Sequence, residues 1–484
     1  MTTLDRRTFL KRGTFVAGGM TIAGPLQALA RRIALGETLT AEGYGPLVDM
    51  GDLYLPEGFH YRIISRTGEP MSDGNPAPTR FDGMSAFTAP DGSTVLVRNH
   101  ENRRRLRPDG RVNAPLGEID VQVSPADLRY DPNPVFNGGV TKLTVQDRNV
   151  VASRAVLGGT IANCAGGKTR WGSWITCEEF FAPPPPTVFP PESARHGYIF
   201  EAPAFVDAPV KAVPIVAAGR FEHEAVAWEE GALYETEDQP DASFYRFTPA
   251  HGPRAHGDLA AGNGTLEALK VTDAFALDTR AGITGGVGTS LAVEWVPIEN
   301  PDPPSDAVPP VGGDITQYGV RYQAQARGAA IFRRTEGCWS EDGHVFFDCT
   351  NGGAAGLGQI WHLDVELNTL TLVYESQSIE TLNKPDNLTV SPTEDLFICE
   401  DLGDGLATAP HIRAITKGGQ IYNFAKAKAN TTEFCGACFN PKPLGGYRGT
   451  KFENLTLFVN QQGSPPTGVP GVTYAIWGPW KRTD

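Results

Sequence analysis

The sequence contains none of the short motifs that mark the most familiar hydrolases. A Gly-x-Ser-x-Gly nucleophile elbow and a His-Glu-x-x-His zinc motif are both absent. The glycine-rich stretch at residues 282–290 lacks the Walker pattern that cradles phosphates. No motif therefore supports a serine hydrolase, a zinc protease or a P-loop nucleotide-binding protein.

Excess positive charge and paired cysteines are also missing. The chain has 42 Lys and Arg against 56 Asp and Glu, a net charge of −14 at pH 7, which argues against a nucleic acid partner. The 7 cysteines are an odd number, whereas a disulfide framework would use an even one. Cys435 and Cys438 form a lone CxxC pair, which is weak evidence for zinc, and we interpret it as structural.

The first residues predict export. Arg6 and Arg7 lie in a twin-arginine pattern, which is read by a receptor. The weakly hydrophobic run at residues 14–24 is too short to span a bilayer, and an A-x-A-like cleavage site follows at residues 28–30. These signals predict recognition by the twin-arginine translocase.

The expected domain organisation follows from this signal. Residues 1–30 are expected to be a twin-arginine signal peptide, and residues 31–484 a single catalytic domain without stable membrane insertion. The mature protein would be periplasmic or extracellular. Twin-arginine export carries folded proteins, which suits a protein that acquires a metal cluster before it leaves the cytoplasm.

The chain is rich in turns and repeats one pattern of strands. It has 55 Gly and 39 Pro in 484 residues. Three segments each start with a carboxylate, turn sharply and return to a ligand-type residue 13 positions later: Glu224 to Glu237, Glu336 to Cys349, and Asp386 to Cys399. Both ends of such a strand pair lie on the same face.

Three looser copies complete the repeat. They begin at Asp82, Cys164 and Cys435 and end at 99–101, 177–179 and 458–462. Six such units with few helical stretches predict an all-β fold, a six-bladed β-propeller with long loop insertions, of which residues 251–330 carry the longest. Acidic strand ends that converge on one channel mouth repel one another unless cations compensate them, so the pattern predicts a metal site.

The chain also resembles the PhoX-type alkaline phosphatases, which are twin-arginine-exported propellers. The resemblance spans about residues 50–480. It rests on the segments Asn99-His100-Glu101, Trp171 to Glu179, Gly219 to Ala225, Thr236-Glu237-Asp238, Phe244 to Phe247, Arg334 to Gly337, Pro385-Asp386-Asn387, Cys399-Glu400-Asp401 and Phe458 to Gln462.

The resemblance implies a monomer that hydrolyses phosphomonoesters, with small phosphorylated substrates as its partners. It also implies a cluster of Fe3+ ions (two, oxo-bridged) and several Ca2+ ions. Cys177, Glu224 and Glu336 would be iron ligands, with Cys177 as a bridging thiolate. Arg334 would grip the phosphate through its planar guanidinium. The implied calcium shell consists of hard oxygen donors: Asn99, Glu101, Glu178, Glu237, Asp386 and Glu400.

Two other functions stay open at this stage. One is a calcium-dependent propeller lactonase or arylesterase, which would need a single catalytic calcium and no role for Cys177. The other is a non-catalytic exported propeller whose metals are structural. Iron bound through a thiolate should give a visible charge-transfer band, whereas calcium alone gives none.

Overall fold

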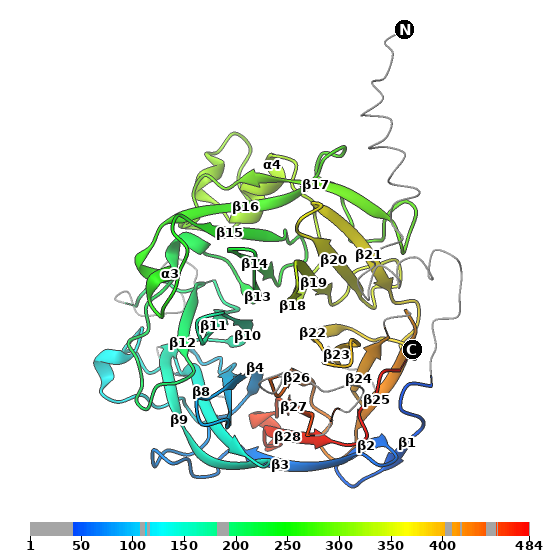
Figure 1. Ribbon diagram of the computed structural model, residues 1–484. Coiled ribbons are helices and arrows are strands. Elements are labelled where there is room, and N and C mark those ends of the chain that lie inside the picture. Colours follow the sequence, from blue (N-terminus) through cyan, green and yellow to red (C-terminus); the bar gives the residue numbers. More distant parts are fainter. Residues whose placement is uncertain are drawn as a thin grey trace.

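The structure is a computed structural model that describes residues 42–106, 112–113, 117–181, 193–401, 409–416, 419–441, 452 and 454–483. The predicted signal peptide at residues 1–30 therefore lies outside the described residues. The fold is all-β, with strands arranged around a central axis (Figure 1). Among the described residues, no helix is long and apolar enough to cross a membrane.

Six inner strands surround the central axis, and each pairs with an antiparallel return strand (Figure 1). The inner strands are β4 (Phe81–Thr88), β10 (Asn163–Lys168), β13 (His223–Glu229), β18 (Thr335–Glu341), β22 (Pro385–Val390) and β26 (Phe434–Phe439). The return strands are β5 (Thr94–His100), β11 (Ser173–Glu178), β14 (Ala232–Glu237), β19 (His344–Cys349), β23 (Leu396–Glu400) and β27 (Thr456–Gln461). The repeated strand pair expected from the sequence is therefore present.

The prediction of a six-bladed propeller is wrong. Behind the inner strands, the chain forms four blade-like sheets and one continuous nine-stranded sheet, ordered β13-β14-β15-β16-β17-β21-β20-β19-β18. The bounds of its outer strands are β15 (Tyr245–Pro249), β16 (Gly264–Val271), β17 (Ser290–Pro297), β20 (Gln359–Asp364) and β21 (Thr369–Glu375). Strand β17 pairs with β16 on one side and β21 on the other, so it fuses what would have been two blades.

The four blade-like sheets contain three to six strands each. Their orders are β4-β5-β8-β9, β10-β11-β12, β26-β27-β28-β3 and β22-β23-β24-β25-β2-β1. The bounds of the outer strands are β1 (Leu47–Asp49), β2 (Leu53–Pro56), β3 (His60–Arg66), β8 (Gly138–Gln146), β9 (Asn149–Thr160), β12 (Ile199–Pro203), β24 (His411–Ile415), β25 (Ile421–Ala427) and β28 (Val472–Trp477).

The two ends of the chain close the ring together. The early strand β3 pairs with the last strand β28, from Val472↔Arg66 to Trp477↔His60. The preceding strand β2 pairs with β25 in the neighbouring sheet. Because the first strands complete the last two sheets, the circle of strands is joined by hydrogen bonds rather than by packing alone.

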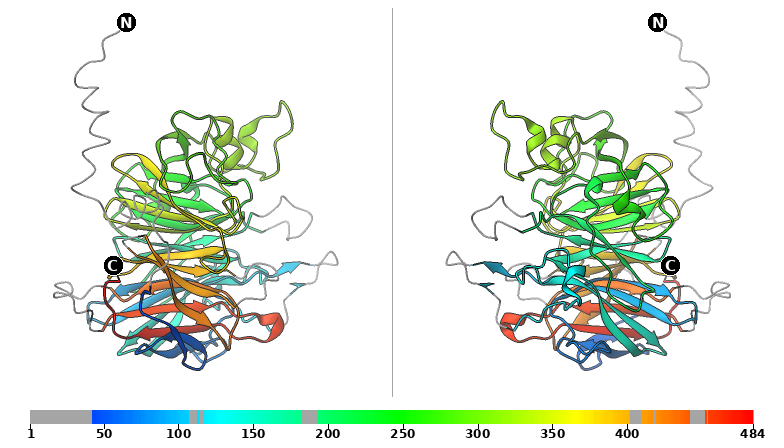
Figure 2. Two further views of the ribbon diagram at one scale, coloured as in Figure 1. Left: turned by 90° about the vertical axis from the view of Figure 1, so that its right-hand side faces the viewer. Right: turned by 90° about the vertical axis from the view of Figure 1, so that its left-hand side faces the viewer.

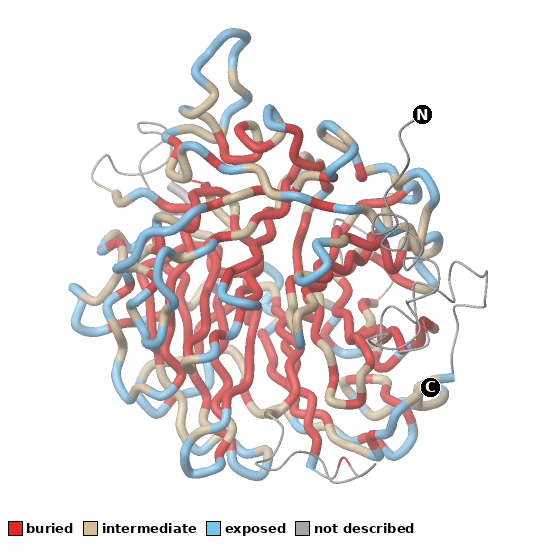
Figure 3. The backbone as a smooth tube through the Cα atoms, turned by 45° about the horizontal axis from the view of Figure 1, so that its top comes forward, coloured by how far each residue is buried: buried red, intermediate tan, exposed pale blue. Residues whose placement is uncertain are grey.

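Insertions between the strands gather on one face. Figure 2 shows the ribbon of β6 (Arg105–Leu106) and β7 (Val112–Asn113) projecting from the same face as α4 (Val320–Ala326) and its flanking loops. The remaining short helices are α3 (Asp258–Ala261), η1 (Ala126–Leu128), η2 (Val216–Ala218), η3 (Ile315–Gln317) and η4 (Pro465–Thr467). Figure 3 shows most strands buried and most connecting loops exposed, and the apolar core lies between neighbouring sheets.

Candidate metal centre at the channel mouth

Each inner strand changes register against its return strand at the same place. The shifts lie between Phe81 and Met84, Asn163 and Gly166, His223 and Val226, Thr335 and Cys338, Pro385 and Leu388, and Cys435 and Cys438. A bulge of this kind bends a strand and re-aims a side chain. One polar residue stands at each shift, and we call these six the ring residues: Asp82, Cys164, Glu224, Glu336, Asp386 and Cys435.

The ring residues come close enough to share cations. Ligand atoms of Glu224, Glu336 and Asp386 lie within 4.8 Å of one another, and all three residues are buried. Two further groups meet the same limit. One combines the ring residues Cys164 and Glu224 with Glu179, and the other combines the ring residue Asp82 with Glu101 and Glu433.

A second tier of side chains lies above the ring, and a repeated hydrogen bond places it there. The residue that follows each return strand donates its backbone N–H to the carbonyl of the residue two positions before the ring residue. For example, Asp238 donates to Glu222 at 3.2 Å, and Asp401 donates to Lys384 at 2.9 Å. We call these donors the mouth residues: Glu101, Glu179, Asp238, Thr350, Asp401 and Gln462.

Two arginines lie among these carboxylates: Arg334 joins the ring to the mouth, and Arg103 joins two mouth residues. The guanidinium of Arg334 donates to both carboxylate oxygens of Asp238, at 2.7 and 2.9 Å, and to Glu336 at 2.7 Å. Its other nitrogen is 3.9 Å from Asp401. Arg103 pairs with Glu101 and Glu179 on the other side of the mouth. Arg334, predicted as the phosphate-binding residue, therefore lies among the carboxylates, with its side chain 28% exposed.

Burial and crowding favour the protonated forms of the ring acids. Burial, followed by the charge of Asp238, raises the pKa of Glu336 well above its ordinary value. Burial and Glu336 do the same for the pKa values of Glu224 and Asp386, and burial and Glu224 raise the pKa of the Cys164 thiol. Such a group of carboxyls ionises readily only when cations bind among them.

The structure brings several predicted site residues together. Glu224, Glu336 and Asp386 form one close group, Glu101 belongs to another, and Arg334 bonds to Glu336. Glu224, Glu336, Asp386 and Glu101 start or end repeated strand pairs, whereas Arg334 was expected from the family resemblance.

Three predicted calcium ligands point away from the mouth, and all of them hold loops. Glu178 accepts hydrogen bonds from the backbone of Ile161 and Gly197, at 3.1 and 2.9 Å. Glu237 bonds to Tyr245 and Arg321 at 2.6 and 3.1 Å, and Glu400 to Asn383 and Arg413 at 2.9 and 2.8 Å. Because side chains alternate along a strand, the adjacent residues Glu179, Asp238 and Asp401 face the mouth instead.

Two other predicted ligands lie behind the ring. The amide of Asn99 donates to the carbonyls of Cys164 and Ala165 at 2.9 and 2.7 Å, and its oxygen accepts from Trp174 at 2.8 Å. Cys177 is fully buried in an apolar cluster that also contains Cys164, and no close group of ligand atoms among the described residues includes Cys177. The thiol that does join such a group is Cys164.

Sequence reasoning missed several residues of the centre. Asp82 and Cys164 begin looser copies of the repeat, at the place where Glu224 stands in its own copy, so the repeat carried a signal for both. Glu433 precedes β26 and has no such signal. The other missed residues are the mouth acids Glu179, Asp238 and Asp401 and the cation Arg103.

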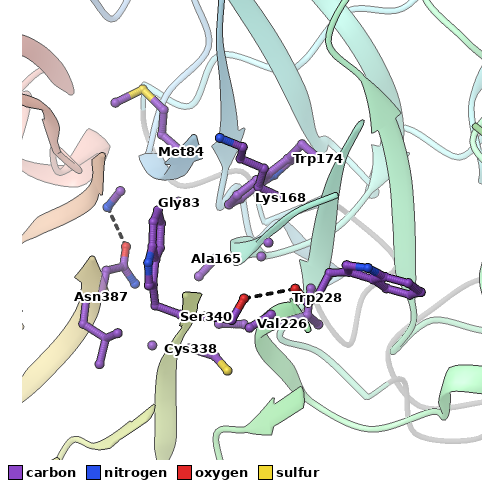
Figure 4. A pocket seen from close by; sticks show the side chains of 18 of the residues that line it. Gly83, Met84, Ala165, Lys168, Trp174, Val226, Trp228, Cys338, Ser340 and Asn387 are labelled. Atoms are coloured by element: carbon purple, nitrogen blue, oxygen red, sulfur yellow. Dashed lines mark hydrogen bonds between the residues drawn. The ribbon is translucent and has the colours of Figure 1, made fainter. Parts of the chain in front are cut away.

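Small residues form a floor beneath the ring. A Cβ atom on Gly337 would stand 2.3 Å from the carbonyl oxygen of Asp386, and one on Gly436 would stand 2.5 Å from that of Asp82. Below this floor, the channel opens into a pocket of about 280 Å³ (Figure 4). Its walls include Trp174, Trp228 and Lys168, so its chemistry differs from that of the acidic mouth.

The fold and the mouth define an all-β protein with a central channel and a buried acidic cluster. The family model described as "Alkaline phosphatase PhoX" matches residues 42–156 and 149–451 of the sequence. The chain belongs to the PhoX alkaline phosphatase family. No curated protein matches the chain.

A solved structure of a PhoX protein shows the same fold. A structure of Pseudomonas fluorescens PhoX in complex with vanadate, a transition state analogue, is 18% identical, with a TM-score of 0.62 over 91% of this chain and 98% of that one. A gluconolactonase from Xanthomonas campestris is 10% identical, with a TM-score of 0.34 over 90% and 98% of the two chains. The WD40 domain of Toxoplasma gondii coronin is 13% identical, with a TM-score of 0.36 over 91% and 90%.

Proposed function

We propose that the protein is a metal-dependent phosphatase that hydrolyses phosphomonoesters at the channel mouth. Membership of the PhoX family supports the reaction class. The observation that carries the proposal is the close group formed by Glu224, Glu336 and Asp386, whose ligand atoms lie within 4.8 Å in a buried site. Carboxylates crowded in this way repel one another, and bound multivalent cations offset that repulsion.

The residues present fit the iron and calcium ions that the family implies. Hard oxygen donors suit calcium, and Asp82, Glu101 and Glu433 offer three within one close group. A thiolate suits iron, and Cys164 stands beside Glu224 and Glu179. We propose Cys164 as the thiolate ligand in place of Cys177, because only Cys164 shares a close group with carboxylates among the described residues.

The chain itself supplies binding and orientation. Bound ferric and calcium ions would act as Lewis acids on a phosphoryl group and activate the attacking water. Arg334 would contribute a fixed cation, because Asp238 accepts from two nitrogens on one edge of its guanidinium and leaves the third nitrogen 3.9 Å from Asp401. In the proposed complex, this third nitrogen donates to the equatorial phosphoryl oxygens instead of facing Asp401.

One assay separates this function from its alternative. The purified protein is tested on a phosphomonoester, a phosphodiester and a lactone, with iron and calcium quantified in the same samples. We expect turnover of the phosphomonoester, inhibition by vanadate and loss of both activity and visible colour after metal removal. Turnover of the lactone alone, in colourless protein that holds only calcium, would instead establish the lactonase.

A further inference from the structure

Two threonines link the strand that carries Glu336 to the strand pair that carries Glu224. Thr236, in β14, is fully buried, and its hydroxyl accepts a hydrogen bond from the backbone N–H of Ala225 at 2.9 Å. The same hydroxyl donates to the carbonyl oxygen of Glu336 at 2.5 Å. One side chain therefore touches the main chain at Glu336 and at the residue next to Glu224.

Thr335 makes the reciprocal link. It is fully buried at the start of β18, and its hydroxyl accepts from the backbone N–H of Glu237 at 2.8 Å and donates to the carbonyl of the same residue at 2.9 Å. Thr236 thus reaches from β14 to β18, and Thr335 reaches back from β18 to β14. We call this pair of side chains the threonine clasp.

The clasp lies where the sheet provides no ladder. Strands β13 and β18 are the two ends of the nine-stranded sheet, so they are not hydrogen-bonded neighbours, although they lie side by side at the channel (Figure 1). The separation of Glu224 on β13 and Glu336 on β18 therefore depends on side-chain links and packing across this gap.

Equivalent links occur at two other gaps between inner strands. The amide of Asn99 donates to the carbonyl of Cys164 at 2.9 Å, and the amide of Asn460 donates to that of Asp82 at 2.6 Å. Thr236, Asn99 and Asn460 stand at the same place in their return strands. Each comes one residue before the residue that pairs with the start of the inner strand: Glu237 pairs with His223, His100 with Phe81, and Gln461 with Phe434. The recurrence indicates a building rule: the side chain behind one ring position holds the backbone of the next.

We propose that Thr236 and Thr335 are positioning residues that set the distance between Glu224 and Glu336 for a shared cation. This role rests on the proposed metal-dependent function. A cation shared by two carboxylates requires both at coordination distance, and a hydroxyl bonded to both strands keeps them there before the cation arrives. Changing groups that orient metal ligands typically weakens metal affinity by about 10- to 100-fold.

The chain offers a matched control for this test. Thr389, on β22, is as buried as Thr236, and its hydroxyl has no hydrogen-bond partner in the part of the chain that the structure describes. Thr389→Val thus makes the same chemical change without breaking a clasp. Thr236→Ser is the conservative variant, because it keeps the hydroxyl.

The experiment measures iron and calcium affinity by chelator competition, the visible absorption band and the melting temperature of the metal-free protein. We expect Thr236→Val and Thr335→Val each to weaken iron affinity by about 10- to 100-fold relative to Thr389→Val and to shift the visible band. The double variant should lose less than the product of the single losses, because the two hydroxyls hold the same gap. Thr236→Ser should restore affinity to near the wild-type value.

The outcomes separate this role from the function on which it rests. If the wild-type protein binds neither iron nor calcium, the proposed function fails, and the positioning role of the threonine clasp fails with it. If the wild type binds both, but Thr236→Val and Thr335→Val bind as tightly as Thr389→Val, the clasp is overturned and the function stands. If Thr236→Val does not fold, Thr335→Val and Thr236→Ser decide the question in the same way.

Discussion

Arg334 and Glu336, two residues apart in the chain, meet again as an ion pair at the mouth, where Nη2 of the arginine donates to Oε1 of the glutamate at 2.7 Å. The backbone of Arg334 is left-handed, with φ of 50°, as it is at the same position of three other repeats, in Arg80, Ala162 and Lys384. A non-glycine residue in this conformation costs about 1 kcal/mol or more and often marks a functional site.

Replacing Arg334 with Lys tests whether the planar guanidinium matters. Arg334→Lys keeps the charge but loses the fork that bonds Asp238 on one side and reaches Asp401 on the other. We expect kcat/KM for a phosphomonoester to fall by about 100-fold, with a melting temperature close to that of the wild type. A large loss of melting temperature with retained kcat/KM would assign Arg334 a structural role.

Replacing the adjacent carboxylates Glu237 and Asp238 with amides should affect different properties, stability in the first case and activity in the second. Glu237→Gln removes one of the three carboxylates that pair with the buried Arg321, which keeps Asp241 and Asp306, and should lower the free energy of unfolding by about 1–2 kcal/mol. Asp238→Asn should leave stability nearly unchanged but lower kcat/KM, because it loosens Arg334 at the mouth. Chemical denaturation and steady-state kinetics on both variants check this, and reversed effects would show that the assignment of the two side chains is wrong.

The same alternation explains which of the predicted ligands lie at the mouth. Glu224, Glu336 and Asp386 begin inner strands after a clear turn pattern, and their convergence follows from the repeat. Glu178 and Glu237 were predicted as ligands although their neighbours Glu179 and Asp238 face the mouth. A shift of one residue reverses the face of a strand, and the bulges that set this register carry no motif of their own.

The number of blades could not be predicted for a related reason. The repeat shows strand pairs, and these pairs are present. Whether neighbouring pairs close into separate sheets depends on their outermost strands. Strand β17, from the region that fitted the repeat worst, bonds to β21 through Ser290–Ala292, and this long-range pairing has no local signature.

The stability of the metal-free protein should fall as the pH rises above about 4.5. Burial, then Asp306 and Asp238, raise the pKa of Glu222 at the mouth from 4.5 to about 7. Between these values the folded protein holds a proton that the unfolded chain has lost, so the free energy of unfolding decreases with pH, by about 2–3 kcal/mol for this group. The ring carboxyls, whose pKa values are also raised, act in the same direction.

Urea denaturation with a chelator present, at pH 5, 6, 7 and 8, measures this slope. Glu222→Gln should reduce the pH dependence of the free energy of unfolding between pH 5 and 7. Metal affinity should show the opposite trend and rise with pH, because cations must displace these protons. A metal-free protein that gains stability from pH 5 to 7 would contradict the raised pKa values.

Export is tested at the twin-arginine pair. Replacing Arg6 and Arg7 with Lys conserves charge but removes the pattern that the translocase reads. We expect the substituted protein to stay in the cytoplasm, as measured by cell fractionation and immunoblotting against an unrelated exported control. Normal yield of the variant outside the cytoplasm would rule out this route.

The most direct measurement is the location of iron in crystals of the purified protein, by anomalous scattering at the iron absorption edge. We expect a peak within coordination distance of Glu224, Glu336 and the sulfur of Cys164, in the group whose ligand atoms already lie close together. No peak among the ring residues, or a peak beside Cys177 in its apolar cluster, would contradict the metal centre proposed for this family member.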